Sequence, residues 1–246
     1  MAKERLDQLV VAQGLAASRA KAQALILAGE VFTGEIRLDK PGTLVAVETA
    51  LRLKTTGPSY VSRGAHKLIA GLDAFAIAPA GRLCLDIGAS TGGFTEVLLE
   101  RGAARVVAVD VGHGQLDWRL RTDPRVVVLE RTNARHLTAE ALPGAPQLVV
   151  CDASFIGLRT VLPAALGLAA PAAELVALIK PQFEAGPEAV GKGGVVRDAA
   201  VHEAVCASVR DWLEATLGWT VLGLVPSPIL GPKGNREFLI GARKPR

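Results

Sequence analysis

The sequence has few cysteines, few aromatic side chains and no long uninterrupted apolar run. Its three cysteines, Cys84, Cys151 and Cys206, lie far apart and form an odd number, so they do not suggest a disulfide framework. Neither the cysteines nor the four histidines show the spacing of metal ligands. We therefore expect no bound metal, and a reducing compartment such as the cytoplasm.

Two stretches bear on export and membranes. The first residues mix both charges with apolar side chains, which is not the pattern of a secretory signal. Residues 215–232 carry no charge, but glycines and prolines interrupt them, so a membrane-spanning helix is not expected there. The sequence therefore predicts no membrane partner.

The net charge of +4 is unevenly distributed. The first 67 residues contain ten Lys or Arg and six Asp or Glu, whereas the rest of the chain has 18 of each kind. A basic end on a neutral body favours a polyanion-binding module. An excess of this size is equally typical of an ordinary solvated surface.

The first 57 residues are expected to form a small α+β domain. Leu6, Leu9 and Val10 have helical spacing, and Ser18 is placed to cap a second helix over residues 19–28. Apolar runs at 30–32 and 43–47 predict strands. Because Gly57-Pro58 then breaks the chain, we expect domains at 1–57 and 63–246, with a linker at 58–62.

The second domain alternates apolar runs with helical stretches, which favours a doubly wound α/β fold with a parallel sheet. A short connection before the last run predicts an antiparallel final pair. The expected strands are 83–87, 106–109, 126–129, 148–150, 175–179, 220–225 and 237–242, and the expected helices are 94–101, 115–122, 158–168 and 198–217.

A turn of small residues follows the first of these strands, between Asp86 and Phe94. Such a turn lets backbone N–H groups approach a ligand at a helix N-terminus. Asp110 ends the next strand, where an acid can accept ribose hydroxyls. Ser90 stands where a nicotinamide fingerprint requires its second glycine, so the turn resembles S-adenosylmethionine sites more than dinucleotide sites.

Four charged residues are expected to converge beside this turn. Asp152 and Lys180 follow parallel strands, whose carboxyl ends share one edge of the sheet. Glu237 begins an antiparallel strand and therefore returns to that edge, and Lys67 can reach it from the preceding helix. A surface ion pair is the ordinary alternative for any one of them.

These four residues resemble the Lys-Asp-Lys-Glu tetrad of FtsJ-like ribose 2'-O-methyltransferases. The first segment resembles the S-four-type RNA-binding domain, and its matching residues are Arg5-Leu6-Asp7, Leu9-Val10, Gly14-Leu15, Ser18-Arg19, Ala22, Leu25-Ile26, Gly29 and Val31. Together the two resemblances cover essentially the whole chain and are similar to the TlyA family. That family carries both haemolysin and ribosomal RNA methyltransferase names.

The resemblance implies a Rossmann-like class I methyltransferase sheet behind a small N-terminal RNA-binding domain. It also implies S-adenosylmethionine as cofactor and a cytidine of ribosomal RNA or ribosomal subunits as substrate, with 23S RNA favoured and 16S RNA an alternative. The linker residues Pro58-Ser59-Tyr60-Val61 depart from the Arg-x-Trp-Val of some members. This departure puts any linker-specific switch in doubt.

The resemblance also implies a set of site residues. The catalytic set is Lys67, Asp152, Lys180 and Glu237. The cofactor-binding set is Asp86, Gly88, Ala89, Ser90, Thr91, Gly92, Gly93, Phe94, Asp110 and Asn133. The RNA-binding set is Arg5, Arg19, Lys21, Gln23, Arg63, Lys233 and Arg236.

The chemistry of ribose methylation agrees with these roles. A 2'-hydroxyl is a poor nucleophile, so a base must take its proton as the methyl group arrives. A lysine can do so only in its neutral form, which burial and a nearby cation favour. We expect Lys180 to be that base, with Lys67 as the nearby cation and the two carboxylates orienting both lysines.

Several readings stay open at this stage. Asn133 either holds the adenine or only forms a turn, and the glycine-rich residues 186–194 either close on RNA or are simply flexible. A non-catalytic ribosome-associated RNA-binding protein and a membrane-active haemolysin are the rival functions. The sequence does not predict the oligomeric state.

Overall fold

The computed structural model describes residues 2–34, 36–53, 60–191 and 193–246. Its contacts divide the chain into two units, Met1–Ser59 and Tyr60–Arg246. The expected break at Gly57-Pro58 lies outside the described residues. Tyr60, Val61 and Ser62, which we expected in the linker, belong to the second unit, where the Val61 N–H donates to Glu96 Oε2 at 2.7 Å.

The N-terminal unit contains two helices, α1 (Leu6–Ala12) and α2 (Arg19–Leu27). The predicted cap is confirmed, because the Ser18 side chain accepts a hydrogen bond from the Lys21 N–H. Its strands form two small sheets, β1 (Lys3–Arg5) with β4 (Leu44–Ala46), and β2 (Val31–Thr33) between β3 (Ile36–Arg37) and β5 (Arg52–Leu53). Apolar residues of both helices form its core, among them Leu6, Leu9, Val10 and Ile26.

The second unit is built on a seven-stranded sheet with the order β11-β12-β10-β9-β6-β7-β8. The pairs from β10 to β8 are parallel, and β12 is antiparallel to both neighbours, as predicted. The strands are β6 (Leu83–Ile87), β7 (Arg105–Val109), β8 (Val126–Leu129), β9 (Leu148–Cys151), β10 (Glu174–Ile179), β11 (Thr220–Pro226) and β12 (Phe238–Arg243).

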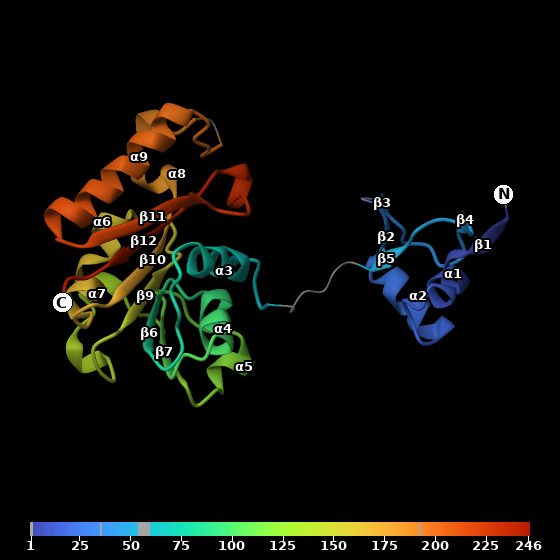
Figure 1. Cartoon of the computed structure of the whole chain (residues 1–246), viewed down its shortest axis with the longest axis horizontal. Coiled ribbons are helices and arrows are strands. Elements are labelled where there is room, and N and C mark those ends of the chain that lie inside the picture. Colours follow the sequence, from blue (N-terminus) through green and yellow to red (C-terminus); the bar gives the residue numbers. More distant parts are fainter. Residues whose placement is uncertain (1, 35, 54–59, 192) are drawn as a thin grey trace. The chain divides into compact units, whose positions relative to one another are not determined.

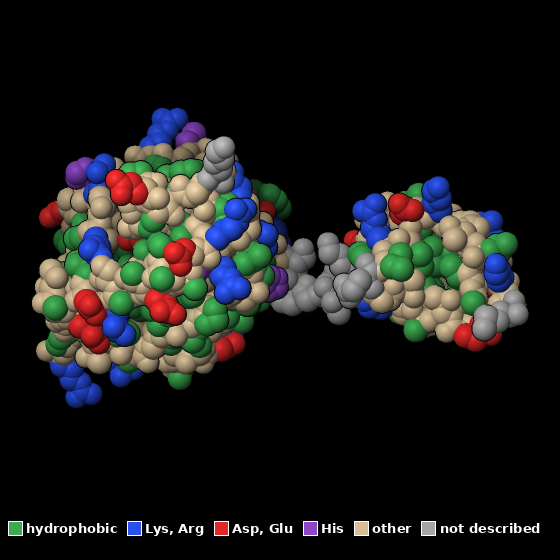
Figure 2. Space-filling view, turned by 90° about the horizontal axis from the view of Figure 1, so that it is seen from above, with side chains coloured by type: hydrophobic (Ala, Val, Ile, Leu, Met, Phe, Trp, Pro, Cys, Tyr) green, Lys and Arg blue, Asp and Glu red, His purple; other side chains and the backbone are tan. Residues whose placement is uncertain are grey.

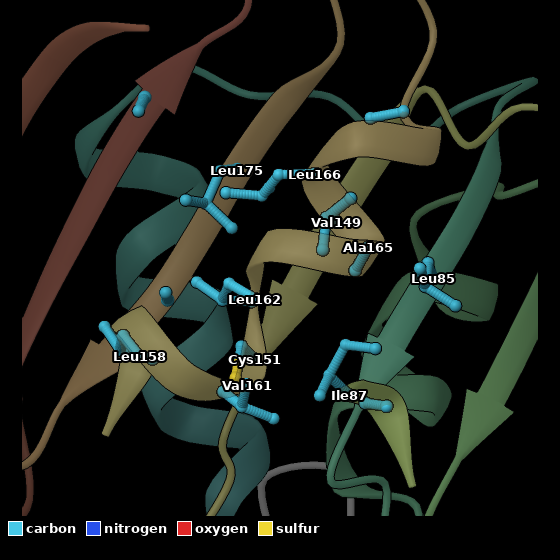
Figure 3. Packing of buried hydrophobic residues seen from close by; sticks show 14 of the residues in the cluster. Leu85, Ile87, Val149, Cys151, Leu158, Val161, Leu162, Ala165, Leu166 and Leu175 are labelled. Carbon is cyan, nitrogen blue, oxygen red and sulfur yellow. The ribbon is translucent and has the colours of Figure 1, made fainter. Parts of the chain in front are cut away.

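Helices cover both faces of this sheet, which confirms the doubly wound fold (Figure 1). One face packs against α3 (Gly64–Ala74), α4 (Gly93–Glu100) and α5 (Trp118–Arg121). The other packs against α6 (Leu158–Val161), α7 (Pro163–Leu168) and α9 (Ala199–Asp211). Figure 3 shows Leu85 and Ile87 of β6 and Val149 of β9 facing Val161, Leu162 and Ala165 of the α6–α7 segment.

Three expected helices were wrong in extent. The stretch 115–122 shortens to α5, which begins after Asp117 caps it. The stretch 158–168 divides because Pro163 begins a new helix and has no N–H to continue the first one. The stretch 198–217 is helical almost throughout, but it is α-helix only to the end of α9, where a π-helical turn (Trp212–Thr216) continues it.

Helix α3 lies unusually close to the sheet because Gly71 has no side chain. A Cβ built on Gly71 would lie 2.7 Å from Cγ1 of Val176 in β10, which is closer than real Cβ contacts occur. Four residues earlier on the same face of α3 is Lys67, which is 5% exposed. The glycine therefore allows the helix to bring this lysine to the sheet edge.

Candidate active site

The four expected catalytic residues meet at the carboxyl edge of the parallel strands. Lys67 Nζ lies 2.6 Å from Glu237 Oε2 and 3.7 Å from Asp152 Oδ2. Lys180 Nζ lies 2.6 Å from Asp152 Oδ1. Asp152 thus bridges the two lysines, and the geometry matches the arrangement expected from the sequence.

The sheet itself brings these residues together. Asp152 directly follows β9, and Lys180 directly follows β10, its parallel neighbour. Glu237 precedes β12, whose first residue Phe238 pairs with Ile179, the last residue of β10. Because the antiparallel β12 begins where β10 ends, Glu237 arrives beside Lys180 without any long loop.

Burial makes this cluster different from a surface ion-pair network. Lys67, Lys180 and Glu237 are 5%, 6% and 2% exposed, and only Asp152 retains moderate side-chain exposure, 20%. Two lysines and two carboxyl groups lie together in this space. Removing one partner would leave an uncompensated buried charge, which costs far more than losing an exposed pair.

Lys180 has two further oxygen neighbours. Its Nζ donates to Ser154 Oγ at 2.9 Å and to the Asp152 backbone carbonyl at 3.2 Å. Sequence reasoning missed Ser154, because nothing in the spacing of Cys151-Asp152-Ala153-Ser154-Phe155 shows which side chain faces the neighbouring strand.

The turn after β6 needs glycine at two positions because the protein's own atoms pack closely against it. Gly88 has φ +80°, and a Cβ on it would lie 3.0 Å from Cα of Ala153. Gly92, at φ +100°, precedes the first residue of α4, and a Cβ there would collide with Leu120. Ser90 also has a positive φ, +48°, although it is not glycine.

Asp110 fixes this turn as well as lining it. Its Oδ2 accepts the Ser90 N–H at 2.8 Å, and its Oδ1 accepts the Gly112 N–H at 2.7 Å. Each carboxylate oxygen keeps a lone pair for a further donor, such as a ribose hydroxyl.

A cavity of about 470 Å³ opens beside the turn. Among its lining residues are Gly88, Ser90, Asp110, Asn133, Asp152, Ser154 and Phe155. A second, smaller cavity of about 230 Å³ adjoins it and is lined by Lys67, Lys180 and Arg63, with Ala89, Thr91, Gly93 and Phe94 of the turn. Gly88, Ser90, Asp152 and Ser154 line both, so the two cavities share a border.

Asp86 is a buried residue behind this border and lines neither cavity. Its Oδ2 accepts the Thr95 hydroxyl at 2.7 Å, whereas its Oδ1 has no hydrogen-bond partner among the described residues. Burial raises the pKa of Asp86 to about 7.

Asn133 forms a turn, one of the two roles that the sequence left open, and it also lies at the larger cavity. Its side chain accepts the Arg135 N–H at 3.1 Å and so caps a 3₁₀ turn (Ala134–His136), and the residue also lines the larger cavity. Arg135, which the sequence analysis did not select, lines the same cavity.

Phe155 was also missed by the sequence analysis. It is 90% exposed at the rim of the larger cavity and has φ +65°. Its ring lies 5.2 Å from that of Phe183, centroid to centroid. Positive φ at a bulky residue costs free energy and is commonly found at functional sites.

The expected RNA-binding residues occupy two places. Arg63 lines the smaller cavity and donates to the Leu230 carbonyl at 2.9 Å, while Lys233 and Arg236 are exposed near Glu237 in the sequence. Arg5, Arg19 and Gln23 gather in the N-terminal unit instead, where all three donate to Asp7. Lys21 is exposed. Figure 2 shows Lys and Arg side chains spread over the visible face of that unit.

The glycine-rich segment expected over the active edge is attached to the site at its end. Gly191 pairs with Val195, and the Asn235 side chain accepts the Val196 N–H at 3.1 Å and donates to the Gly194 carbonyl at 2.9 Å. Lys192 lies outside the described residues. Asn235 stands two residues before Glu237, so the side chain that holds this segment is close in the chain to one member of the tetrad.

The described parts of the chain offer neither a metal-binding cluster nor a membrane-spanning helix. No group of three or more His, Cys, Asp or Glu residues there could hold a metal ion. No helix in those parts is both long enough and apolar enough to cross a membrane.

Known proteins similar to this chain share both units. Residues 60–244 match the model of the FtsJ-like methyltransferases, and residues 4–50 match the S4 domain. The 16S/23S rRNA (cytidine-2'-O)-methyltransferase TlyA of Mycobacterium tuberculosis is 56% identical over 98% of this chain and 90% of its own length. Hemolysin A of Brachyspira hyodysenteriae is 39% identical over 96% of this chain and 98% of its own length.

Solved structures agree with this assignment. A hemolysin-like protein from Streptococcus thermophilus is 43% identical, with a TM-score of 0.76, and the match covers 100% of this chain and 90% of the other. The N-methyltransferase NodS of Bradyrhizobium japonicum, 19% identical with a TM-score of 0.51, covers 76% of this chain and 97% of its own and shares the fold. This chain belongs to the TlyA family, which joins an S4 domain to an FtsJ-like methyltransferase domain.

Proposed function

We propose that this protein transfers a methyl group from S-adenosylmethionine to the ribose 2'-hydroxyl of a cytidine in ribosomal RNA, in the cytoplasm. One observation carries the proposal: a buried Lys-Asp-Lys-Glu cluster lies directly beside a cavity lined by the turn after β6 and by Asp110. The names of the Mycobacterium relative and of a Campylobacter jejuni relative, 36% identical over 79% of this chain and 75% of its own length, support the cytidine 2'-hydroxyl as target.

The residues present fit the cofactor. The cavity volume lies in the range of ordinary small-molecule sites, and Gly88 and Ser90 of the turn before α4 line its wall. Asp110 is placed to accept hydroxyls, and the orphaned Oδ1 of Asp86 is a buried acceptor close to the same turn. S-adenosylmethionine, when bound, supplies a methyl group on a sulfonium sulfur, which leaves as a neutral thioether.

The chain's own residues would then handle the proton. Lys180 takes the proton of the 2'-hydroxyl, and the oxygen's freed electron pair forms the new bond to the methyl carbon. Asp152 holds Lys180 in place, and Glu237 holds Lys67, whose charge lies near the developing negative oxygen. The intact cluster opposes the reading of a non-catalytic RNA-binding protein.

The RNA anchor in this proposal is the N-terminal unit. Arg5 and Arg19 have side chains 42% and 53% exposed, so their guanidinium groups can contact phosphates while Asp7 orients them. Arg63, Lys233 and Arg236 would hold the RNA beside the tetrad. The Mycobacterium relative is named for both ribosomal RNAs and the Campylobacter relative for 23S RNA alone. Because 23S RNA is common to both names, we favour it as the substrate and test both RNAs.

The test is methyl transfer to purified ribosomal subunits by the wild-type protein and by Lys180→Ala. We expect the wild type to mark a cytidine 2'-oxygen, and Lys180→Ala to lose roughly a hundredfold or more of that activity because the base is gone. Lys180 lines only the smaller cavity, so calorimetric binding of S-adenosylhomocysteine should stay near normal. Lys180→Arg keeps the charge, but a guanidinium stays protonated and cannot accept the proton, so this variant should fail as well. Full turnover by Lys180→Ala would overturn the assignment.

A further inference from the structure

A lysine that acts as a base must be discharged after each turnover. When the 2'-hydroxyl gives its proton to Lys180, the amine becomes an ammonium, and this proton must reach water before the next reaction. Lys180 is only 6% exposed, so its contact with bulk water is limited. The oxygens around Nζ therefore decide the route that the proton takes.

Three oxygens surround Lys180 Nζ, and they differ in what they can do. The Asp152 carbonyl, at 3.2 Å, accepts a hydrogen bond but does not carry a proton away. Asp152 Oδ1, at 2.6 Å, can accept a proton, but an ionised carboxylate has no proton of its own to pass on in exchange. Ser154 Oγ, at 2.9 Å, belongs to an exposed residue.

A hydroxyl is also the one group among these three that can accept a proton and give up another in the same event. It has one O–H donor and two acceptor lone pairs, and its hydrogen rotates freely. Ser154 is exposed and stands on the border of both cavities, so its hydroxyl is open to water.

We propose that Ser154 is a further catalytic residue that conducts the proton of Lys180 to solvent between turnovers. An Nζ–H bond breaks and its proton joins Ser154 Oγ, while the hydrogen already on Oγ passes to a water molecule or a buffer base. Lys180 becomes a neutral amine, Ser154 ends as the hydroxyl it began as, and one proton enters the solvent. This inference rests on the proposed function in naming Lys180 as the base, but the proton route is a property of the free protein.

The first experiment measures hydrogen exchange of the lysine ammonium groups by ¹⁵N NMR, with the Lys180 signal assigned by its loss in Lys180→Arg. We expect Ser154→Ala to slow exchange of the Lys180 signal roughly tenfold, whereas Ser154→Thr, which keeps a hydroxyl, stays near wild type. Ser208→Ala removes a hydroxyl from α9, outside the two cavities, and serves as the matched control. Unchanged or faster exchange in Ser154→Ala would mean that the hydroxyl is dispensable or only shields the ammonium, and either result overturns the proposal.

The second experiment measures methyl transfer under saturating RNA and cofactor. We expect Ser154→Ala to lower kcat with little change in KM, and added imidazole buffer to restore its rate without affecting the wild type. A variant whose lost rate no buffer restores would show a structural defect and overturn the relay. If the wild type itself methylates neither ribosomal subunit, the proposed function fails, while the exchange measurement still decides the role of Ser154.

Discussion

Two buried aspartates, one in each unit of the chain, have opposite surroundings. Asp7 accepts hydrogen bonds from Arg5, Arg19 and Gln23, and the Arg5 guanidinium above all holds the pKa of its carboxyl well below the usual range. Asp86 accepts the Thr95 hydroxyl on one oxygen, has no partner among the described residues on the other, and burial raises its pKa to about 7.

The two aspartates differ in whether the protein itself supplies all the hydrogen-bond donors of the carboxyl group. The fold itself supplies every donor that Asp7 needs, so this carboxylate stabilises the N-terminal unit and orients its arginines. At Asp86 the described residues leave one oxygen without a donor, so ionising this buried carboxyl lowers the stability of the folded protein.

The largest effect expected from this contrast is on the pH dependence of the free energy of unfolding, and Asp86→Asn tests it. An unfolded aspartate ionises near pH 4, but folded Asp86 keeps its proton to about pH 7, so the wild type loses stability as the pH rises between those values. Asp86→Asn does not titrate there. We expect its stability relative to wild type to rise by about 2 kcal/mol between about pH 5.5 and about pH 8, measured by urea unfolding. An equal difference at both pH values would contradict the assigned environment.

Asp7→Asn should have a smaller effect of the opposite sign. The variant loses the charge that Arg5 and Arg19 share, and we expect the N-terminal unit to lose about 1 to 2 kcal/mol, after allowing for the exposure of both arginines. Because the pKa of Asp7 is lowered on folding, this stability is present above about pH 4 and is lost as the pH falls below it.

Asp39→Asn is the matched control for Asp7, since Asp39 forms an exposed pair with Arg37 at 3.5 Å and should contribute almost nothing. Thermal unfolding of the N-terminal unit, followed by NMR signals of its core residues, measures both variants. Equal losses in the two variants would mean that Asp7 is no more than a surface charge.

The smallest expected effect concerns the salt dependence of RNA binding. Each phosphate neutralised by a cation changes the slope of log affinity against log salt by about 0.7 to 0.9. Arg19→Gln with Lys21→Gln should therefore make the slope shallower by about 1.4 to 1.8, with cofactor binding unchanged. Arg210→Gln, an exposed residue paired with Asp211 in the other unit, is the control. An unchanged slope in the double variant would place the RNA anchor elsewhere.

Sequence patterns predicted the catalytic sheet well because its central strands, such as β9 and β10, are buried along their whole length. The run Leu83–Ile87 is apolar apart from Asp86, and its bounds were predicted correctly. The tetrad followed from topology, since strand ends alone bring Asp152, Lys180 and Glu237 to one edge. The short strands β1, β3 and β5 were not predicted, because two or three residues are too few for any periodicity.

Interactions between side chains of distant segments were the part that the sequence could not supply. Asp7 was read only as a match to a family pattern, whereas its role depends on residues 12 and 16 positions later that arrive on α2. Ser154 likewise depends on a 2.9 Å contact with the neighbouring strand's end. Such contacts are set by how elements pack, and no local spacing encodes them.

The close approach of α3 to the sheet at Gly71 has a consequence for protein engineering. Replacing a glycine inside a helix by alanine is a common route to heat resistance and typically gains up to about 1 kcal/mol. At this position the added methyl group would meet Val176 at 2.7 Å and push the helix outward, carrying Lys67 away from Glu237. A design strategy that ranks substitutions by helix propensity alone would choose Gly71 early. The backbone would become more rigid, but Lys67 would lose its alignment with Glu237.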